Sequence, residues 1–405
     1  MEEFPNKPLR IAMFSDSYFP ILNGVSVSIR ELIEELRRRG HSVHLYTSAY
    51  PKYKDDDPNI IRFPALMTPF AKGYPLTIGP FYFKLKQFRN THFDIVHTHT
   101  PFTVGFVGMR WAESHELPLV STYHTLYEKY IHYIPFLSKK YLWFKIAKHT
   151  NYYYNRCHHV IAPSEAAKNS LKRHGVKKPI SIIPSGNPAP KKISKIEAKQ
   201  QLGIREDEKV LLYVGRIAKE KNLTTLLEMA KIVFELHDDA RLIFVGDGPY
   251  RKESQILARK LGIGDKTKFI GAIPRSEVDH YYSAADLFVF SSMTETQGLV
   301  IGEAMSFGVP AVAVHGGGAS ASIKDGENGF IVPNDVGIFA ETVSNMLSNP
   351  ALLGRLSENA KKSVNLWTFN QMCDAILQVY YKTLSENLNL TNHQKDKNHV
   401  DSRTN

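Results

Sequence analysis

The chain has 405 residues, which is enough for two domains and too long for one core of ordinary size. Its composition, 43% hydrophobic and 22% charged, is that of a globular protein and argues against extensive disorder. The net charge of +11 suits a partner that carries negative charge, such as nucleic acid or an anionic membrane surface.

Cysteines and targeting segments restrict the expected compartment. Cys157 and Cys373 are too few for a disulfide framework and do not have the spacing of a metal site. The first ten residues lack the apolar core of a secretory signal, and no run of about 18 apolar residues predicts a spanning helix. We therefore expect a cytoplasmic protein in a reducing compartment.

The first half of the chain alternates short apolar runs with helical patterns. A helical period over residues 26–39 ends at Gly40. The apolar runs predict buried strands at residues 9–15, 41–47, 93–99, 117–124 and 158–164. Repeated β-α units of this kind predict parallel sheets with helices on both faces.

The pattern restarts after a Pro-rich and Lys-rich stretch near residues 184–190, which suits a linker. Further strands are predicted at residues 209–216, 241–248, 267–273, 286–292 and 309–315. The fold class is therefore α/β, with two Rossmann-like domains whose parallel sheets face a cleft. We expect the parts to be an N-terminal domain at 1–187, a C-terminal domain at 188–366, a helix at 367–385 that packs back on the N-terminal domain, and a disordered tail at 386–405.

Ligands of open α/β sheets bind beyond the carboxyl ends of the strands, so residues just after strands are site candidates. The first such loop has a single glycine, Gly24, and the second strand does not end in an acid. A G-x-G-x-x-G dinucleotide site is therefore disfavoured. Gly24 is either a simple turn glycine or the point where a diphosphate approaches the next helix.

Two cations, Arg216 and Lys221, follow the first strand of the second half. At a strand's carboxyl end they suit a pyrophosphate, although solvated surface charge explains them equally well.

Two acids, Glu295 and Glu303, flank Gly298, where a helix is predicted to begin. The free amides of that helix form a seat for an anion. The alternative is an acid that is stabilised near the helix start by the helix dipole, but this explains only one of the two glutamates. Carboxylates accept two hydrogen bonds each, which suits the vicinal hydroxyls of a ribose and a hexose.

Taken together, "VGRIAKEKN", "VGDGP", "FIGAI" and the E-x7-E pair Glu295–Glu303 resemble the retaining glycosyltransferases of family 4, which have the two-domain GT-B fold. The resemblance covers nearly the whole chain. It implies that Arg216 and Lys221 hold the diphosphate, that Glu303 binds the ribose and that Glu295 contacts the transferred sugar. The other donor-binding positions that it implies are Gly24, Ile273, which flanks the base, and Gln297, Gly298 and Leu299 at the helix start.

Two histidines of the first half extend the resemblance. His124, in "STYHTLYEKYIHYIP", ends a strand where family 4 enzymes place a histidine near the donor sugar, and we expect it to act in catalysis. Alone it would more often be a core histidine or one satisfied by Tyr123. His99, in "HTHTPF", is expected to line the cleft on the acceptor side. Both segments are similar to those of the diacylglycerol glucosyltransferase branch.

A basic segment follows. Residues 138–178 hold ten Lys and Arg and one acid, Glu165. Lys139, Lys140, Trp143 and Lys145 lie in its aromatic first part, the composition of a helix in a membrane interface. A solvated basic helix with core aromatics is the alternative, and a nucleic-acid patch is disfavoured because no recognised binding module accompanies it.

The expected function is transfer of a hexose, glucose from UDP-glucose, to a membrane lipid such as diacylglycerol, with retention, by a protein attached peripherally to the inner face of the cell membrane. No cofactor is expected, since the nucleotide sugar is a co-substrate. No metal requirement is expected either, because the cleft segments have no D-x-D motif nearby. Two alternatives stay open: the same chemistry on a soluble or cell-wall acceptor, and a non-catalytic polyanion-binding protein.

Overall fold

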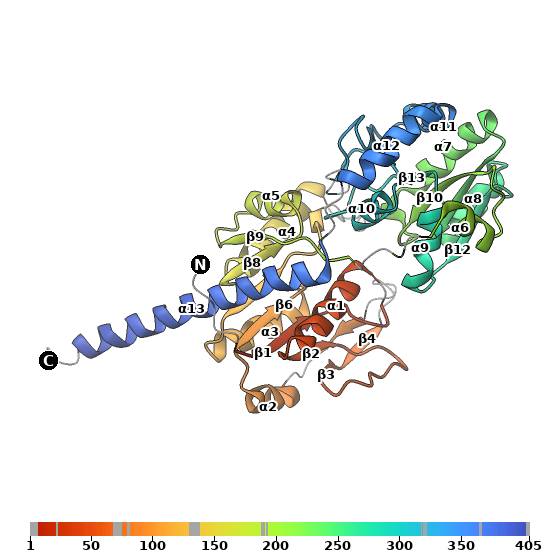
Figure 1. Cartoon of the computed structure of the whole chain (residues 1–405). Helices are drawn as coiled ribbons and strands as arrows, with labels where there is room; N and C mark the ends of the chain where they lie inside the picture. Colours follow the sequence, from red (N-terminus) through yellow and green to blue (C-terminus); the bar gives the residue numbers. More distant parts are fainter. Residues whose placement is uncertain are drawn as a thin grey trace. The chain divides into compact units, whose positions relative to one another are not determined.

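The computed structural model describes residues 7–21, 23–67, 75–78, 82–128, 138–187, 191, 193–316, 318, 322–363 and 367–401. The chain forms two compact units, which are described separately: unit 1 is Met1–Gly186 with Phe369–Asn405, and unit 2 is Asn187–Thr368 (Figure 1). Parts of the segments singled out above, residues 129–137, 188–190, 317 and 319–321, lie outside the described residues.

Unit 1 contains a parallel sheet of seven strands in the order β3-β2-β1-β6-β7-β8-β9. The order reverses at β1, which pairs with β2 on one side and β6 on the other. The bounds are β1 (Arg10–Ser15), β2 (Ser42–Ser48), β3 (Ile60–Phe63), β6 (Ile95–Thr98), β7 (Leu119–Thr122), β8 (His159–Ala162) and β9 (Ile180–Ile182). A separate antiparallel pair is formed by β4 (Ala65–Met67) and β5 (Pro75–Thr77).

The helices of unit 1 follow its strands in the chain. Their bounds are α1 (Gly24–Arg38), α2 (Tyr82–Thr91), α3 (Thr103–Ser114), α4 (Lys139–Tyr154), α5 (Glu165–Arg173) and α13 (Phe369–Asp401). Helix α1 shows why they form. Asn23 caps it by accepting a 2.9 Å hydrogen bond from the Ser26 amide, and Ile29, Leu32, Ile33 and Leu36 form a buried stripe at helical spacing.

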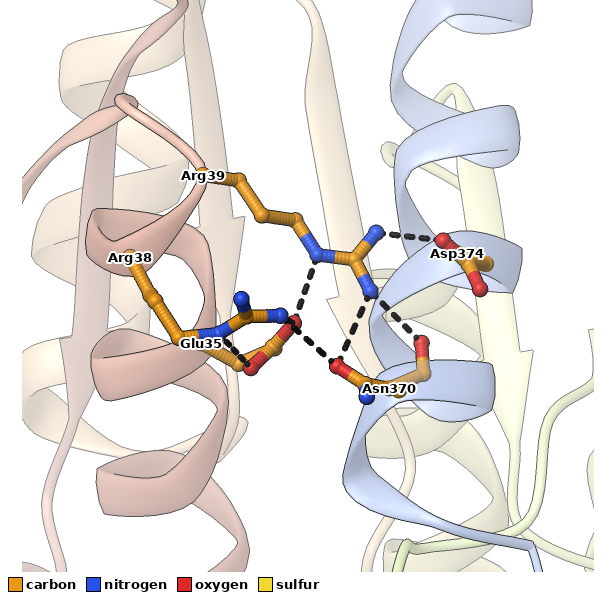
Figure 2. Close-up of polar contacts among 5 residues, drawn as sticks. All are labelled: Glu35, Arg38, Arg39, Asn370 and Asp374. Atoms are coloured by element: carbon orange, nitrogen blue, oxygen red, sulfur yellow. Dashed lines mark hydrogen bonds and ion pairs between the residues drawn. The ribbon is translucent and has the colours of Figure 1, made fainter.

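Helix α13 belongs to unit 1 and contacts α1 through a polar network (Figure 2). Arg39 donates to Glu35 at 2.7 Å and to the Asn370 carbonyl at 3.0 Å, and it pairs with Asp374. Arg38 donates to Glu35 at 2.7 Å and to Asn370 Oδ1 at 3.0 Å. These contacts tie the first turns of α13 to the end of α1.

The end of the chain differs from the expectation. Residues 386–405 were expected to be disordered, yet α13 continues as a helix to Asp401. Backbone hydrogen bonds within a helix need no buried partner, whereas the expectation rested on the shortage of apolar side chains.

Unit 2 contains a parallel sheet of six strands in the order β12-β11-β10-β13-β14-β15, which reverses at β10. Its strands are β10 (Lys209–Val214), β11 (Ala240–Val245), β12 (Thr267–Gly271), β13 (Leu287–Phe290), β14 (Ala311–Val314) and β15 (Gly329–Val332). Its helices are α6 (Lys195–Gln201), the 3-10 turn η2 (Lys219–Lys221), α7 (Leu223–Leu236), α8 (Arg251–Lys260), α9 (Arg275–Ala284), α10 (Leu299–Ser306), α11 (Val336–Ser348) and α12 (Pro350–Ser363).

The predicted α/β class with two parallel sheets is confirmed. Strands with long apolar runs, such as β1, β10 and β11, were predicted because both of their faces are buried. Five of the described strands were missed. Strands β3, β9 and β15 lie at sheet edges, have three or four residues each, and are only partly buried. Strands β4 and β5 have three residues each and pair only with each other.

Candidate functional site

The carboxyl ends of two neighbouring strands place the candidate residues of unit 2. Strand β10 pairs with both β11 and β13, so the sheet order reverses there. This is the position at which ligands bind in open α/β sheets. The β10 loop carries Arg216 and Lys221, and the β13 loop carries Glu295. Pairing of the two strands therefore brings the cations and the acid to one edge of the sheet.

Lys221 and Glu295 form a direct ion pair between Nζ and Oε1, although 74 positions separate them in the chain. Both side chains are mostly buried, at 13% and 23% exposed. Ser291, at the end of β13, contacts the loop that follows β10: its Oγ lies 2.8 Å from the carbonyl oxygens of Lys221 and Asn222. The sequence singled out both charged residues for different roles and did not predict that they touch.

Arg216 lies at the start of the same loop. The buried Tyr213 donates a 3.1 Å hydrogen bond to its carbonyl oxygen. Its guanidinium lies 4.0 Å from the carboxylate of Glu220, and about a third of the Arg216 side chain is exposed. A partly exposed guanidinium at a strand's carboxyl end is suited to a phosphate.

Glycines shape the loop before α10. Gly298 has φ +68° and turns the chain into the helix, which begins at Leu299, after Gln297. Gly318 donates a 2.6 Å backbone hydrogen bond to Glu295, and a Cβ there would lie 2.0 Å from the Thr296 carbonyl oxygen. The close approach therefore requires glycine.

Glu303 lies inside α10 and has different partners from Glu295. Tyr282 of α9 donates a 2.8 Å hydrogen bond to its Oε2, and Arg275 Nη2 lies 3.5 Å from the same oxygen. Ile273, the predicted base-flanking residue, lies two positions before Arg275 and packs partly against the core. Tyr282 and Arg275 were missed, although their seven-residue spacing on a predicted helix was a usable signal.

The histidines of unit 1 meet for the same topological reason. His99 follows β6, His124 follows β7, and these strands are paired. His99 Nδ1 lies 3.1 Å from His124 Nε2, and the rings are stacked. His97 contacts the His99 ring at 4.1 Å and hydrogen-bonds to Tyr380 of α13 at 2.6 Å and Thr122 at 2.7 Å. His97 and Tyr380 were not singled out from the sequence.

Burial sets the charge of these histidines. It lowers the pKa of His97 to about 3 and that of His124 to about 4, and it lowers the pKa of His99 well below its ordinary value. All three are therefore neutral near pH 7. Neutral imidazoles donate and accept hydrogen bonds, which suits hydroxyl groups better than anions.

Asp16, directly after β1, was also missed. Burial raises the pKa of its carboxyl group, which accepts hydrogen bonds from Thr100 at 2.6 Å and from the Val104 amide at 2.9 Å. It joins the β1 loop to the start of α3. Gly24 is the first residue of α1, and a Cβ there would meet nothing within 4 Å, so its surroundings are open.

The basic segment begins with α4, whose surface is both apolar and cationic. Lys139, Lys140 and Lys145 are exposed, and so are Trp143 at 43% and Phe144 at 56%. Leu142 of the same helix is buried. The core-aromatic alternative therefore does not apply to Trp143 and Phe144.

The described part of the chain has neither a candidate metal cluster nor a helix that could span a membrane. Within it, no group of three or more His, Cys, Asp or Glu side chains is arranged to hold a metal ion. Within it, too, every helix is too short or too polar to span a bilayer.

Two parallel α/β units with candidate residues beyond the strand ends are typical of GT-B glycosyltransferases, and solved structures of this fold superpose on the chain. Sucrose-phosphate synthase from Thermosynechococcus elongatus matches with a TM-score of 0.74 at 22% identity, over 93% of this chain and 100% of its own. HepE from Anabaena, solved with UDP and glucose, matches with a TM-score of 0.70 at 20% identity, over 92% and 99%.

Sequence comparisons identify the family. The model "Glycosyltransferase Family 4" matches residues 22–187, and "Glycosyl transferases group 1" matches residues 194–363. The alpha-monoglucosyldiacylglycerol synthase of Acholeplasma laidlawii is 32% identical over 94% of this chain and 98% of its own. The Streptococcus pneumoniae protein of the same name is 35% identical, over 76% and 71%. The chain belongs to the family 4 (group 1) glycosyltransferases.

The neutral histidines predict acid sensitivity in unit 1. Each unfolded-state pKa, near 6.5, lies above the folded one, so the unfolded chain binds more protons and stability falls as pH drops below about 6.5. The loss is about 2 kcal/mol each for His97 and His124 by pH 5. Hydrogen exchange of β6 and β7 amides at pH 5–7 measures it. His97→Gln should flatten the pH dependence, and the exposed His92→Asn should not.

Proposed function

We propose that this glycosyltransferase moves glucose from UDP-glucose to diacylglycerol in a membrane, with retention at the anomeric carbon. The observation that carries the proposal is the meeting of Lys221 and Glu295 at the carboxyl ends of β10 and β13. Lys221 would bind the diphosphate and Glu295 the sugar. These two residues are neighbours, just as the diphosphate and the sugar are neighbours in a nucleotide sugar.

The names of the relatives support the choice of sugar, acceptor and stereochemistry. Both alpha-monoglucosyldiacylglycerol synthases carry a glucose, a diacylglycerol and an alpha linkage in their names. UDP-glucose is itself an alpha-glycoside, so an alpha product corresponds to retention. The choice of uridine follows the UDP bound in the HepE structure.

We assign donor binding to unit 2. Departure of the diphosphate builds negative charge on the leaving oxygen, which Arg216, Lys221 and the first amides of α10, near Gln297, Gly298 and Leu299, would stabilise. With cations supplied by the protein, no metal is needed in this scheme. Glu295 would contact the transferred glucose, Glu303 the ribose, and Ile273 the base.

We assign the acceptor side to unit 1. In this scheme the acceptor hydroxyl attacks from the face that the diphosphate leaves, and the leaving phosphate oxygen takes its proton. His124, with His99 hydrogen-bonded to it, would orient hydroxyl groups as a neutral imidazole. Gly24, at the open start of α1, would allow a phosphate to approach the backbone.

Helix α4 supports attachment to an anionic lipid surface. Exposed Trp143 and Phe144 beside Lys139, Lys140 and Lys145 combine apolar insertion with charge attraction. Such attachment would bring the protein to an acceptor that stays in the bilayer.

The central test offers the protein radiolabelled UDP-glucose, UDP-galactose and GDP-mannose together with diacylglycerol vesicles. We expect an alpha-glucosyl lipid from UDP-glucose, with the anomer assigned by NMR. Transfer to water-soluble acceptors and not to diacylglycerol would contradict the lipid assignment, and transfer from none of the donors would contradict the whole proposal.

Glu295→Gln should separate turnover from nucleotide binding. Because Glu295 is assigned to the sugar, kcat should fall about 100-fold while the Kd for UDP changes less than about threefold. Steady-state glycolipid synthesis and titration calorimetry measure the two effects. The exposed Glu327→Gln is the matched control. Equal losses of kcat and UDP affinity would contradict the sugar-contacting role.

Neutralising Lys139, Lys140 and Lys145 to Gln should weaken binding to anionic vesicles about 100-fold, since each basic residue near the surface contributes about 1 kcal/mol. Co-sedimentation with vesicles measures the change. A control variant neutralises the exposed Lys231, Lys252 and Lys260 of unit 2 and removes the same charge. Equal weakening by both variants would show that net charge, and not α4, drives attachment.

A further inference from the structure

One face of helix α9 points charged and polar groups at Glu303. Arg275, Asp279 and Tyr282 are spaced four and three residues apart, which puts them on the same side of the helix. Asp279 accepts a 2.6 Å hydrogen bond from Arg275 Nη1, and a second from the Lys191 amide at 3.0 Å. Asp279 therefore holds the guanidinium in place.

The two ends of this face meet the same oxygen of Glu303. The Tyr282 hydroxyl donates to Oε2 at 2.8 Å, and Arg275 Nη2 lies 3.5 Å from it. Among the described residues, Oε1 accepts no hydrogen bond, although the Glu303 side chain is only 13% exposed. The protein thus occupies one oxygen of the carboxylate and leaves the other for a different partner.

The tyrosine is held rigidly. Tyr282 is 0% exposed, and its ring stacks on Phe307 at 5.4 Å and lies 6.2 Å from Phe288. A fixed phenol fixes the rotation of the carboxylate that accepts from it. A carboxylate oxygen has two lone pairs, so Oε1 is able to accept from both hydroxyls of a vicinal pair.

We propose that Tyr282, assisted by the Asp279-held Arg275, is a positioning residue that orients Glu303 toward the ribose 2′- and 3′-hydroxyls of the nucleotide sugar. The inference rests on the proposed function, in which Glu303 binds the ribose. It extends that function by assigning recognition of the ribose to a pair of elements, α9 and α10, and not to one glutamate.

The test compares binding of UDP with binding of 2′-deoxy-UDP by titration calorimetry. In the wild-type protein UDP should bind about 10-fold to 100-fold more tightly, the range for a hydrogen bond to a charged group. Tyr282→Phe keeps the ring and removes the hydroxyl. We expect the ratio to fall below about threefold, mainly through weaker UDP binding, with kcat at saturating donor nearly unchanged. Arg275→Gln should lower the ratio less.

Three further variants make the result specific: Tyr281→Phe, Glu303→Gln, and Tyr282→Phe combined with Glu303→Gln. Tyr281→Phe removes the neighbouring hydroxyl on the same helix and should leave the ratio at its wild-type value. Glu303→Gln should lower the ratio as Tyr282→Phe does, and the double variant should lower it no further. A purely structural role of Tyr282 would weaken UDP and 2′-deoxy-UDP equally, and that result would overturn the inference.

Failure of the inference and failure of the proposed function have different outcomes. If Glu303→Gln abolishes discrimination while Tyr282→Phe retains it, the positioning role is wrong and the ribose role of Glu303 stands. If the wild-type protein does not distinguish the two nucleotides, or binds neither, the donor assignment of Glu303 itself is wrong.

Discussion

The pairing of β10 with β13 is the constraint on which the candidate donor site depends. Parallel strands bring their carboxyl ends to one edge, so the loops that follow them meet however far apart they lie in the chain. Here they bring together a lysine and a glutamate that are each mostly buried. A mostly buried charge without a partner is costly, and the ion pair offsets that cost. In the proposed function the diphosphate would replace Glu295 as the partner of Lys221 and release the acid toward the sugar.

Unit 1 applies the same geometry with different chemistry. The ends of β6 and β7 bring His99 to His124, and burial keeps both neutral. One unit therefore presents charged groups at its strand ends and the other presents neutral donors and acceptors. In the proposed function, this division would correspond to the difference between an anionic donor and an acceptor hydroxyl.

Helix α13 connects the end of the chain to the histidines of unit 1. Its first turns are tied to α1 by Arg39, Asn370 and Asp374, and farther along it Tyr380 hydrogen-bonds to His97. His97 in turn contacts the ring of His99. Residues more than 280 positions apart thus support one another through side chains that are buried or partly buried.

Apolar runs and helical periods were enough to predict the α/β class and the strands buried on both faces, because nearly every residue of such a strand is apolar. Motif order was enough to indicate the family, and it singled out Lys221, Glu295 and Glu303. The edge strands β3, β9 and β15 are too short and too little buried to give a recognisable apolar run. The helix that continues to Asp401 depends on backbone hydrogen bonds, which composition does not report.

Only the tertiary structure decided the partners of the site residues: Glu295 for Lys221, Tyr282 for Glu303 and Tyr380 for His97. Those partners follow from strand order and helix packing, which join residues distant in the chain, so local sequence does not determine which of these residues meet.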